Sequence, residues 1–436
     1  MSIVRVIFDK LKSKFLKNTG WLLFEQIYYM GLSLLITSLV ARYLGTHNYG
    51  LINYGLAFVS IFTTISQLGI GEILVHEIIN NRKNTGKIIG TTIGLRIISS
   101  VFSIVLIFVL VMFLNPGEIV IQTITFIQSV SLIFLAFDTV KYWFQSNLES
   151  KYAVISKSIA FTCVSAWRLI LILIKAPVQY FAFATVIEGL VISIFLLIFY
   201  FGFKGQRFLF SLKTAKDLLS KSYYFLISGI FVTIYTQLDK IILGQLTDES
   251  TVGIFAAAMT ISGMWIFVPY SLIDSSRPVI MSLKNKNGEL YKKRFKQLFA
   301  AIIWISLIAS LLITLLSKPI IMILYGEQYI TAVGVLNVLI WSKIFSLIGS
   351  ARTIWLITED LNKFQIIFLA IGAVTNVGLN LLLIPKFGAI GAAIGAIAAE
   401  FISNFIALML FKDTRPLVKL IIEAFLFKGI KEETMK

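Results

Sequence analysis

The sequence predicts an all-α integral membrane protein with twelve membrane-spanning helices, and three observations predict it. Long apolar runs recur along the whole chain, only 14% of the residues are charged, and Lys and Arg gather in every second gap between the runs. A soluble domain carries about a quarter of charged residues, and a helix needs about 20 apolar residues to cross ~30 Å of hydrocarbon. The runs are 19–41, 50–74, 88–113, 118–140, 153–174, 178–202, 222–244, 252–275, 297–316, 332–356, 364–384 and 389–411.

The positions of the basic residues predict the orientation of these spans. Of the 39 Lys and Arg residues, 29 lie in the N-terminal segment, in alternate gaps and in the C-terminal tail. The outward gaps hold only Arg42, Lys175, Lys318 and Lys386. Cytoplasmic loops carry the excess of basic residues, so both termini are expected in the cytoplasm. The net charge of +17 is then a topology signal, and nucleic acid is not an expected partner.

The N-terminal segment and the few Cys and His residues carry further signals. Apolar Ile3, Ile7 and Leu11 recur at four-residue steps among lysines, which favours either a basic amphipathic segment on the inner leaflet or an added topology signal. A lone Cys163 inside a span excludes an internal disulfide, and two His residues far from any Cys make a metal site unexpected. No nucleophile or paired-carboxylate constellation stands out, so neither an enzyme nor a cofactor is expected.

The sequence predicts that the twelve spans form two copies of a repeat of six spans. WFQSNLESKY (Trp143–Tyr152) after span 4 aligns without a gap with WLITEDLNKF (Trp355–Phe364) after span 10, at an offset of 212. The same offset brings Glu188 in span 6 onto Glu400 in span 12. Because six is even, both copies cross in the same orientation, and a pseudo-two-fold axis along the membrane normal should relate them around a central cavity. The expected parts are an N-lobe (1–203), a cytoplasmic linker (204–221), a C-lobe (222–411) and a cytoplasmic tail (412–436).

The passage ARYLGTHNYGLINYGLAFVSIFTTISQLGI (Ala41–Ile70) resembles the first and second spans of Wzx-type polysaccharide and O-antigen flippases. These belong to the multidrug/oligosaccharidyl-lipid/polysaccharide (MOP) exporter superfamily. The related lipid II flippases carry two further C-terminal helices, whereas LIIEAFLF after span 12 is too short to span. The resemblance therefore places the chain nearer the twelve-helix exporters.

The resemblance implies a transporter that moves undecaprenyl-pyrophosphate-linked oligosaccharide units from the cytoplasmic to the outer leaflet by alternating access. It implies a multi-pass protein of the bacterial plasma (inner) membrane, acting in the biosynthesis of surface polysaccharide such as O-antigen of lipopolysaccharide, or capsule. The implied partners are the lipid-linked oligosaccharide, membrane lipid and other polysaccharide-assembly membrane proteins. The alternative is a cation-coupled multidrug antiporter of the MATE type; a membrane polymerase or glycosyltransferase is disfavoured because no gap is long enough for a catalytic domain.

Six basic residues lie within spans and are not explained by topology, so they are candidates for neutralising a pyrophosphate. Arg donates two hydrogen bonds to a phosphate in one plane, whereas Lys supplies a point charge. Arg168 and Lys343 lie nearest the middle of their spans and are the first candidates. The others are Arg96 and Arg352 in cytoplasmic halves, Lys240, and Lys157, whose position also suits snorkelling to the headgroups.

The acidic residues within spans are candidates for coupling transport to protons or Na⁺. They are Glu25, Glu188, Asp239 and Glu400. Each has a structural alternative: Arg168 with Glu188 and Lys343 with Glu400 could be ion pairs inside one lobe, and Asp239 and Lys240 could each pair across helices. Asp138 with Lys141 and Asp274 with Arg277 have the i,i+3 spacing of structural pairs.

Glycine and proline indicate close packing and bending. Gly90 with Gly94, and Gly391 with Gly395, have the four-residue spacing that lets helix backbones approach closely. Pro269 in span 8 lacks an N–H and predicts a bend there.

Overall fold

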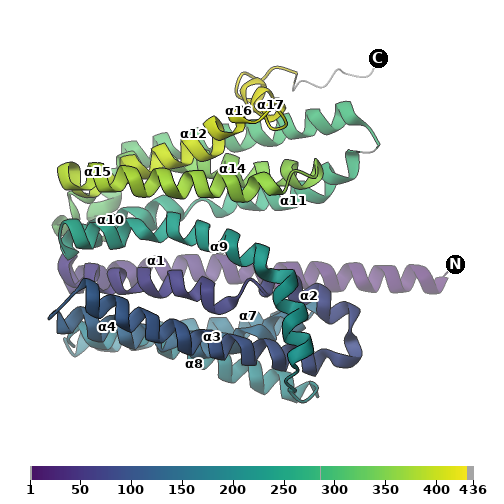
Figure 1. Cartoon of the computed structure of the whole chain (residues 1–436), viewed down its shortest axis with the longest axis horizontal. Coiled ribbons are helices and arrows are strands. Elements are labelled where there is room, and N and C mark those ends of the chain that lie inside the picture. Colours follow the sequence, from purple (N-terminus) through teal and green to yellow (C-terminus); the bar gives the residue numbers. More distant parts are fainter. Residues whose placement is uncertain (1, 285, 430–436) are drawn as a thin grey trace. The chain divides into compact units, whose positions relative to one another are not determined.

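The computed structural model describes residues 2–284 and 286–429, with backbone only for residues 2–19, 22, 23 and 27. The side chains of the basic N-terminal segment and the last part of the tail therefore lie outside the described residues. Every regular element within the described ranges is helical (Figure 1), which confirms the all-α class. The chain forms two compact units, unit 1 (Met1–Thr233) and unit 2 (Ile234–Lys436).

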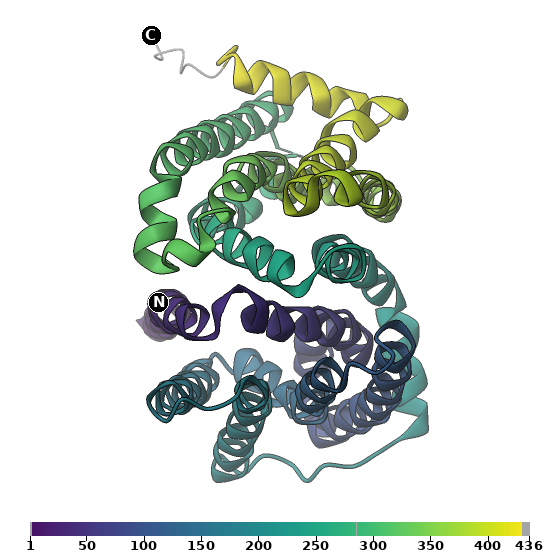
Figure 2. The same cartoon turned by 90° about the vertical axis from the view of Figure 1, so that its left-hand side faces the viewer.

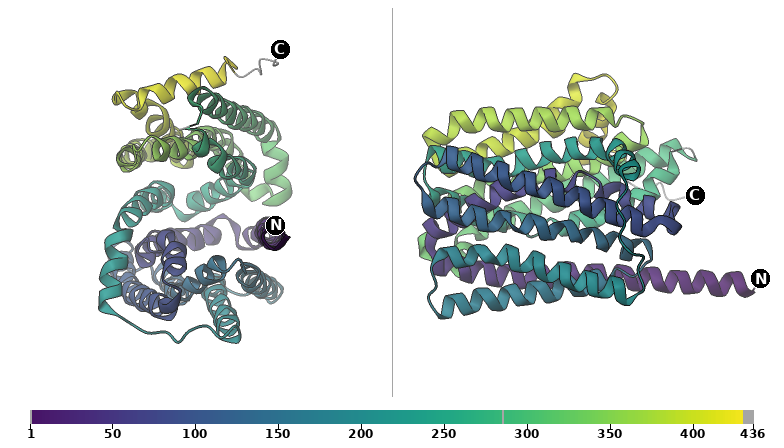
Figure 3. Two further views of the ribbon diagram at one scale, coloured as in Figure 1. Left: turned by 90° about the vertical axis from the view of Figure 1, so that its right-hand side faces the viewer. Right: turned by 60° about the horizontal axis from the view of Figure 1, so that its bottom comes forward.

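Unit 1 is a set of long helices with roughly parallel axes, seen end-on in Figure 2 and lengthwise in the right-hand view of Figure 3. Its buried side chains from α2, α3, α6, α7 and α8 form one apolar cluster. The elements are α1 (Ser2–Gln67), α2 (Gly71–Asn80), η1 (Arg82–Asn84), α3 (Thr85–Leu114), α4 (Ile119–Ser129), α5 (Ser131–Leu135), η2 (Ala136–Thr139), α6 (Val140–Ser146), α7 (Lys151–Leu173) and α8 (Val178–Gly202).

Helix α1 contains a reversal at Gly45, where φ is 74° and ψ is 174°. Only glycine adopts such angles without strain. Before the break, α1 runs along α7, from the Tyr28–Thr162 hydrogen bond to the bond from Tyr43 to the Ala176 carbonyl. After it, the chain runs back along α3, from the Tyr54–Asn115 bond to the bond from Ser99 to the Ile65 carbonyl. The glycine thus lies in the predicted outer turn between spans 1 and 2.

Unit 2 is built in the same way around a second apolar cluster, contributed by α11, α12, α14, α15, α16 and α17. Its longest helix, α15, also contains a glycine break, at Gly388 with φ 54° and ψ −132°. The elements are α9 (Leu212–Leu246), which begins in unit 1, α10 (Glu249–Gly263), α11 (Phe267–Leu283), α12 (Gly288–Leu324), η3 (Glu327–Tyr329), α13 (Ala332–Leu339), α14 (Ser342–Thr358), α15 (Lys363–Phe401), the π-helical turn η4 (Ile402–Ile406), α16 (Ala407–Leu410) and α17 (Arg415–Phe425).

Each of the twelve predicted spans falls on helical structure. By length and composition, nine segments of the described chain could cross a membrane, or ten with the bent pair α10–α11. Two of the nine contain the breaks at Gly45 and Gly388, and dividing them there gives twelve segments, the number of the predicted spans. That each segment crosses the membrane stays a prediction. The chain is therefore a multi-pass membrane protein, and its orientation stays a prediction.

The bend predicted in span 8 is present: α10 and α11 meet at 46°. It lies at the break before Phe267, and Pro269 occupies the first turn of α11. A proline at this place cannot donate to the carbonyl four residues earlier, so a continuous helix across residues 264–266 would lack that bond.

The boundary between the units falls inside α9, beyond the predicted linker 204–221. The reason is that the first part of α9 packs on unit 1. Lys221 Nζ lies 2.9 Å from a Glu77 carboxylate oxygen, and the Thr64 and Thr233 hydroxyls are 2.7 Å apart. The predicted lobe limits stay a prediction, whereas the compact units divide at Thr233.

The glycines that predict close approach contact different partners. A Cβ on Gly391 would lie 2.5 Å from the Leu383 carbonyl oxygen, so this glycine serves the contact between the two arms of α15. A Cβ on Gly90 would lie 2.6 Å from the Leu209 amide nitrogen, in the extended chain that follows α8. Gly90 therefore accommodates the linker rather than a second helix.

Candidate functional site

Four charged residues of unit 1 lie together on α1, α7 and α8, and we call them the unit-1 charge set: Glu25, Lys157, Arg168 and Glu188. Lys157 Nζ is 2.9 Å from Glu25 Oε1, with 40% of the lysine side chain and 20% of the glutamate side chain exposed. Arg168 interacts electrostatically with Glu188, and Lys157 also acts on Glu188. All four side chains are only partly buried. The structure therefore brings Arg168 and Glu188 together, and gives Lys157 a partner in place of a purely snorkelling role.

Aromatic side chains of α1 border this set. Tyr29 interacts electrostatically with Arg168 and Glu188, and its ring lies 4.3 Å from that of Phe161 on α7. The ring is 46% exposed. The Tyr28 hydroxyl is 2.8 Å from the Thr162 hydroxyl. The unit-1 charge set thus lies on an accessible surface lined by hydroxyl and aromatic groups.

Arg96 lies apart from the other candidates of unit 1. Its side chain is 2% exposed, Nη1 donates to the Thr139 hydroxyl at 3.0 Å, and the guanidinium lies 5.9 Å from the centre of the Tyr142 ring. Among the described residues, Nε and Nη2 have no hydrogen-bond partner. A buried cation with so few partners is costly, so Arg96 stays a candidate for anion binding without a defined cavity.

Five charged residues of unit 2 gather on α9, α14 and α15, and we call them the unit-2 charge set: Asp239, Lys240, Lys343, Arg352 and Glu400. The side chains of Asp239, Arg352 and Glu400 are exposed by only 3%, 1% and 8%. Lys343 interacts electrostatically with both Glu400 and Asp239. The unit-2 charge set is therefore more deeply buried than the unit-1 charge set.

Neutral amides hold the acids of unit 2. Asn380 Nδ2 lies 2.5 Å from Asp239 Oδ1 and 3.1 Å from Asn376 Oδ1. Asn404 Nδ2 donates to Glu400 Oε2 at 2.6 Å. The sequence reasoning missed these three asparagines because it counted only charged residues. An Asn is rarely left without partners in a hydrophobic span, and Asn376 with Asn380 at an i,i+4 spacing was the available signal.

Arg352 and Lys240 have local structural partners. Arg352 Nη1 donates to the Ser403 carbonyl at 2.9 Å, and its guanidinium stacks 4.7 Å over the Phe368 ring. Lys240 Nζ donates to Gln237 Oε1 at 3.1 Å. Asp239 and Lys240 thus each have a neutral hydrogen-bond partner, Asn380 across helices and Gln237 on the same helix.

The remaining expectations concern pairs and metals. Lys141 pairs with Asp138, and Arg277 lies 3.7 Å from Asp274, as the i,i+3 spacing predicts. Within residues 2–284 and 286–429, no cluster of three His, Cys, Asp or Glu side chains could hold a metal ion. Both charge sets can bind an ion or a charged group through their side chains.

Comparison with known proteins places the chain in a family. The model of the family described as polysaccharide biosynthesis protein matches residues 15–284. The "Probable flippase AglR" of Haloferax volcanii is 30% identical over 183 residues, which cover 40% of this chain and 37% of AglR. The "Probable low-salt glycan biosynthesis flippase Agl15" of the same organism is 24% identical over 221 residues, 45% of this chain and 44% of Agl15. The chain therefore spans less than half the length of either flippase.

A membrane protein of Methanocaldococcus jannaschii is 24% identical over 427 residues, 90% of this chain and 82% of that protein. Two solved structures share the fold. The lipid II flippase MurJ, in an inward closed conformation, has a TM-score of 0.70 at 15% identity, covering 96% of this chain and 94% of MurJ. An inward-facing MATE multidrug transporter of the MOP superfamily has a TM-score of 0.70 at 15% identity, covering 91% and 96%.

The family model covers more than half of the chain, and the resemblance predicted from residues Ala41–Ile70 is thereby confirmed. The chain belongs to the polysaccharide biosynthesis protein family.

Proposed function

We propose that this protein is a flippase that carries a lipid-linked glycan across the membrane for the biosynthesis of a polysaccharide or another glycan. The family match and the names of AglR and Agl15 support this proposal. The proposal makes the chain a transporter, as the sequence predicts, and not an enzyme.

We further propose that the substrate is an undecaprenyl-pyrophosphate-linked oligosaccharide, moved from the cytoplasmic to the outer leaflet of a bacterial plasma membrane. Both termini would lie in the cytoplasm, as the distribution of basic residues favours. Two six-helix lobes, related by a pseudo-two-fold axis along the membrane normal, would open a central cavity alternately to each side. The curated relatives come from archaea, so the prenyl carrier is a variable of the experiment below.

The observation that carries the proposal is the excess of positive charge within the spans. A pyrophosphate group crossing hydrocarbon needs compensation, because an unpaired charge there costs several kcal/mol. The unit-1 charge set balances two cations with two acids, the unit-2 charge set holds three cations and two acids, and Arg96 adds a further buried cation. A cavity for cationic drugs would require the opposite excess.

We assign roles within these sets by accessibility. Arg168 and Lys343 are only partly buried and close to the acids Glu188 and Glu400, so both can exchange an internal partner for a phosphate. Arg96 and Arg352 are buried and would act on the phosphate through their electrostatic field rather than by direct contact. Lys240 is partly buried but is bound to Gln237, and we assign it the same role. The four acids, which include Glu25 and Asp239, are the proposed proton or Na⁺ coupling groups.

A leaflet-resolved assay tests the function. Purified protein in vesicles is given undecaprenyl-pyrophosphate oligosaccharide labelled on the sugar, and a membrane-impermeant quencher or glycosidase reports the label on each side. We expect protein-dependent movement of the lipid-linked glycan, and a second prenyl carrier tests the choice of lipid. Movement of a cationic drug without movement of the lipid would contradict the proposal and support the MATE-type antiporter.

A further inference from the structure

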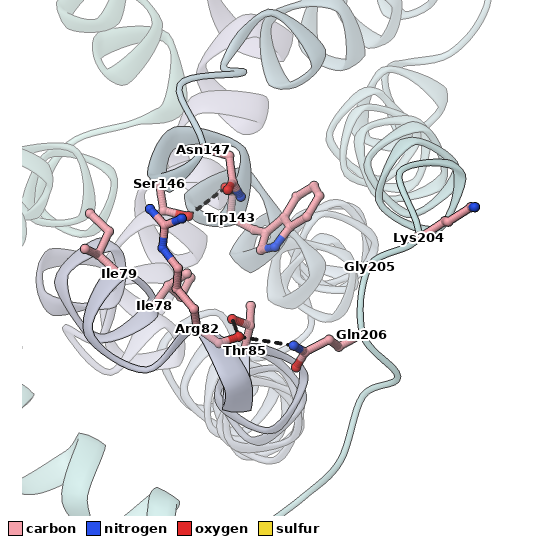
Figure 4. Close-up of a pocket in the computed structure, with 10 residues that line it drawn as sticks. All are labelled: Ile78, Ile79, Arg82, Thr85, Trp143, Ser146, Asn147, Lys204, Gly205 and Gln206. Carbon is pink, nitrogen blue, oxygen red and sulfur yellow. Dashed lines mark hydrogen bonds between the residues drawn. The ribbon is translucent and has the colours of Figure 1, made fainter. Parts of the chain in front are cut away.

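At the end of unit 1 opposite the Gly45 turn lies a cavity of about 180 Å³ (Figure 4). Three connecting segments form it: the turn between α2 and α3, the end of α6 and the chain after α8. All three belong to gaps that the basic residues place in the cytoplasm. The lining residues are Ile78, Ile79, Arg82, Thr85, Trp143, Ser146, Asn147, Lys204, Gly205 and Gln206.

The backbone of Arg82 is held by hydrogen bonds, whereas its guanidinium has no partner among the described residues. Its carbonyl accepts from the Thr85 hydroxyl at 2.9 Å and from Gln206 Nε2 at 3.1 Å. The guanidinium extends over the cavity toward Ser146, whereas the Lys204 side chain points away from it (Figure 4). Among the described residues, the Arg82 guanidinium has neither an ion pair nor a hydrogen bond. A cation thus overhangs the cavity without an anion.

The second copy of the repeat has a carboxylate at this place, which the first copy lacks. At the offset of 212, Trp143, Ser146 and Asn147 correspond to Trp355, Thr358 and Glu359. In unit 2 the place is closed, because Trp355 is 5% exposed and Lys284 lies 3.4 Å from the Glu359 carboxylate and donates to the Thr358 carbonyl.

Tyr291 completes that closure by donating to Glu359 Oε1 at 2.7 Å. Lys284 follows span 8 as Arg82 follows span 2. The copies therefore differ in the residue that faces this basic side chain. Where unit 2 has the Glu359 carboxylate, unit 1 has the neutral Asn147 and an open cavity.

We infer that the unit-1 cavity binds a glycosyl phosphate, whose phosphate takes the place that the Glu359 carboxylate occupies in unit 2. Arg is the side chain best suited to this task, because its planar fork donates two parallel bonds to a phosphate. Nothing else in the cavity supplies a negative charge to Arg82. Its lining is otherwise neutral apart from Lys204, which adds to the positive potential.

The rest of the lining suits a sugar. Trp143 presents its indole to the cavity (Figure 4) and is held by an edge contact with Tyr200 at 5.0 Å, so a flat apolar surface faces the ligand. The Asn147 and Gln206 amides stand on opposite sides. The Gln206 amide is held by the Gly86 N–H and the Arg82 carbonyl, and Asn147 Nδ2 is held by the Trp143 carbonyl. Each amide keeps a second N–H and a further lone pair for a hydroxyl group. Drug-sized ligands fill about 300–1,000 Å³. A cavity of about 180 Å³ therefore holds one sugar rather than an oligosaccharide.

The assignment rests on the proposed function, because it makes the cavity the first docking place of the phosphate-proximal sugar of the lipid-linked glycan. A free sugar phosphate has the same chemistry. The cavity lies at span ends, where a headgroup is presented, and so we commit to the lipid-linked source. The bound sugar would also contact Gly205 and Gln206 of the linker that joins the two units.

Binding to the purified full-length protein in detergent tests the site. The probes are glucose 1-phosphate, glucose, inorganic phosphate and a short-chain prenyl pyrophosphoryl glucose, measured by isothermal titration. We expect saturable binding of both glycosyl phosphates, tightest for the prenyl compound and weak for glucose or phosphate alone. Arg82→Gln should weaken binding roughly tenfold or more, since it removes a charge-assisted bond. The neighbouring Lys83→Gln, outside the lining, is the matched control and should bind like the wild type.

A second variant tests the comparison between the copies. Asn147→Glu restores the carboxylate of unit 2 beside Arg82, so it should abolish binding of glycosyl phosphates while the protein keeps its thermal stability. Asn147→Gln also disturbs the bond from Asn147 to the Trp143 carbonyl but adds no charge, so it should bind glycosyl phosphates more tightly than Asn147→Glu does.

Several results would overturn the inference. These are no saturable binding by the wild type, equal binding by Arg82→Gln, or phosphate alone binding as tightly as glucose 1-phosphate. Binding of the free sugar phosphate without binding of the prenyl compound would refute the docking role. Failure of the proposed function would look different, because the vesicle assay would then show no movement of the lipid-linked glycan while binding persists.

Discussion

The two units place a glutamate at the same position of their last span and surround it differently. Glu188 in unit 1 is partly exposed and interacts with Arg168 of the adjoining α7. Glu400 in unit 2 is 8% exposed and is bound by Asn404 at 2.6 Å, with Lys343 as a further electrostatic partner. A carboxylate at the same position can therefore change its partner in unit 1, where it is partly exposed. In unit 2 a buried network of hydrogen bonds and charges holds it in place. Variants in the two units should therefore fail in different ways.

The largest expected effect is on the stability of unit 2. Arg352→Ala removes the bond to the Ser403 carbonyl and the contact with Phe368, and it leaves Glu400 with less compensation. Removing one member of a buried charged group costs roughly 3–5 kcal/mol. We expect a large fall in the unfolding midpoint in detergent. Arg168→Ala, in the less deeply buried unit-1 charge set, should change the midpoint little. Equal falls in both variants would refute the contrast.

The second effect is on transport. Arg168→Ala and Lys343→Ala should each reduce flipping about tenfold or more, which corresponds to the loss of roughly 1.4 kcal/mol of binding to a phosphate. The amount of protein in the membrane should stay normal. Arg168→Lys and Lys343→Arg keep the charge and should recover part of the rate. Full transport by both alanine variants would refute the assignment of these residues to a phosphate site.

A smaller effect on stability should follow from changing the neutral amides that bind the buried acids of unit 2. Asn380→Ala deprives Asp239 of its bond at 2.5 Å and should cost about 1–3 kcal/mol, because the acid is then buried with fewer partners. Asn380→Asp, which adds a second acid, should cost more. The readout is the unfolding midpoint together with the transport rate. An unchanged midpoint for Asn380→Ala would mean that the asparagine does not stabilise the acid.

The ion pair between Glu25 and Lys157 should contribute less, since 40% of the Lys157 side chain is exposed. Such pairs contribute about 0–1 kcal/mol. Exchanging the two residues in Glu25→Lys, Lys157→Glu should restore the stability lost in either single variant. A coupling role for Glu25 would appear instead as lost transport in the exchanged protein with its stability intact.

The smallest effect concerns α17, which follows the last span of unit 2 where an extended linker follows that of unit 1. The hydrogen bond and charge of Lys296, whose Nζ lies 2.5 Å from Glu423, lower the pKa of this carboxyl below its ordinary value of 4.5. The ionised pair therefore contributes stability above pH 4.5, and that contribution is lost as the pH falls through the lowered pKa. Glu423→Gln should remove this part of the acid sensitivity, measured as the unfolding midpoint between pH 7 and pH 3.

The sequence predicted the spans well because long apolar runs and basic gaps are local signals. The correspondence of Glu188 and Glu400 could also be predicted, since it needs only an alignment of the two halves. Burial could not be predicted in the same way. Arg96 and Lys157 both read as cations within spans, yet 2% of Arg96 is exposed and Lys157 has a partner 132 residues away in the chain.

The cavity beside Arg82 could not be predicted from the sequence either. Counting charges assigned Arg82 to topology, because its role depends on three segments that meet only in the fold. The substitution of Asn147 for the carboxylate at the position of Glu359 was visible in the aligned repeats. Its meaning required the contacts of Lys284 and Tyr291 in unit 2.

The leaflet-resolved vesicle assay, run with the wild type and with the double variant Arg168→Ala, Lys343→Ala, tests the central claim most directly. The account predicts movement of the pyrophosphate-linked oligosaccharide by the wild type and little movement by a double variant that is equally abundant and folded. Movement of the lipid-linked glycan at the same rate by both proteins would contradict the role of these cations. Absence of movement by the wild type would contradict the proposed function itself.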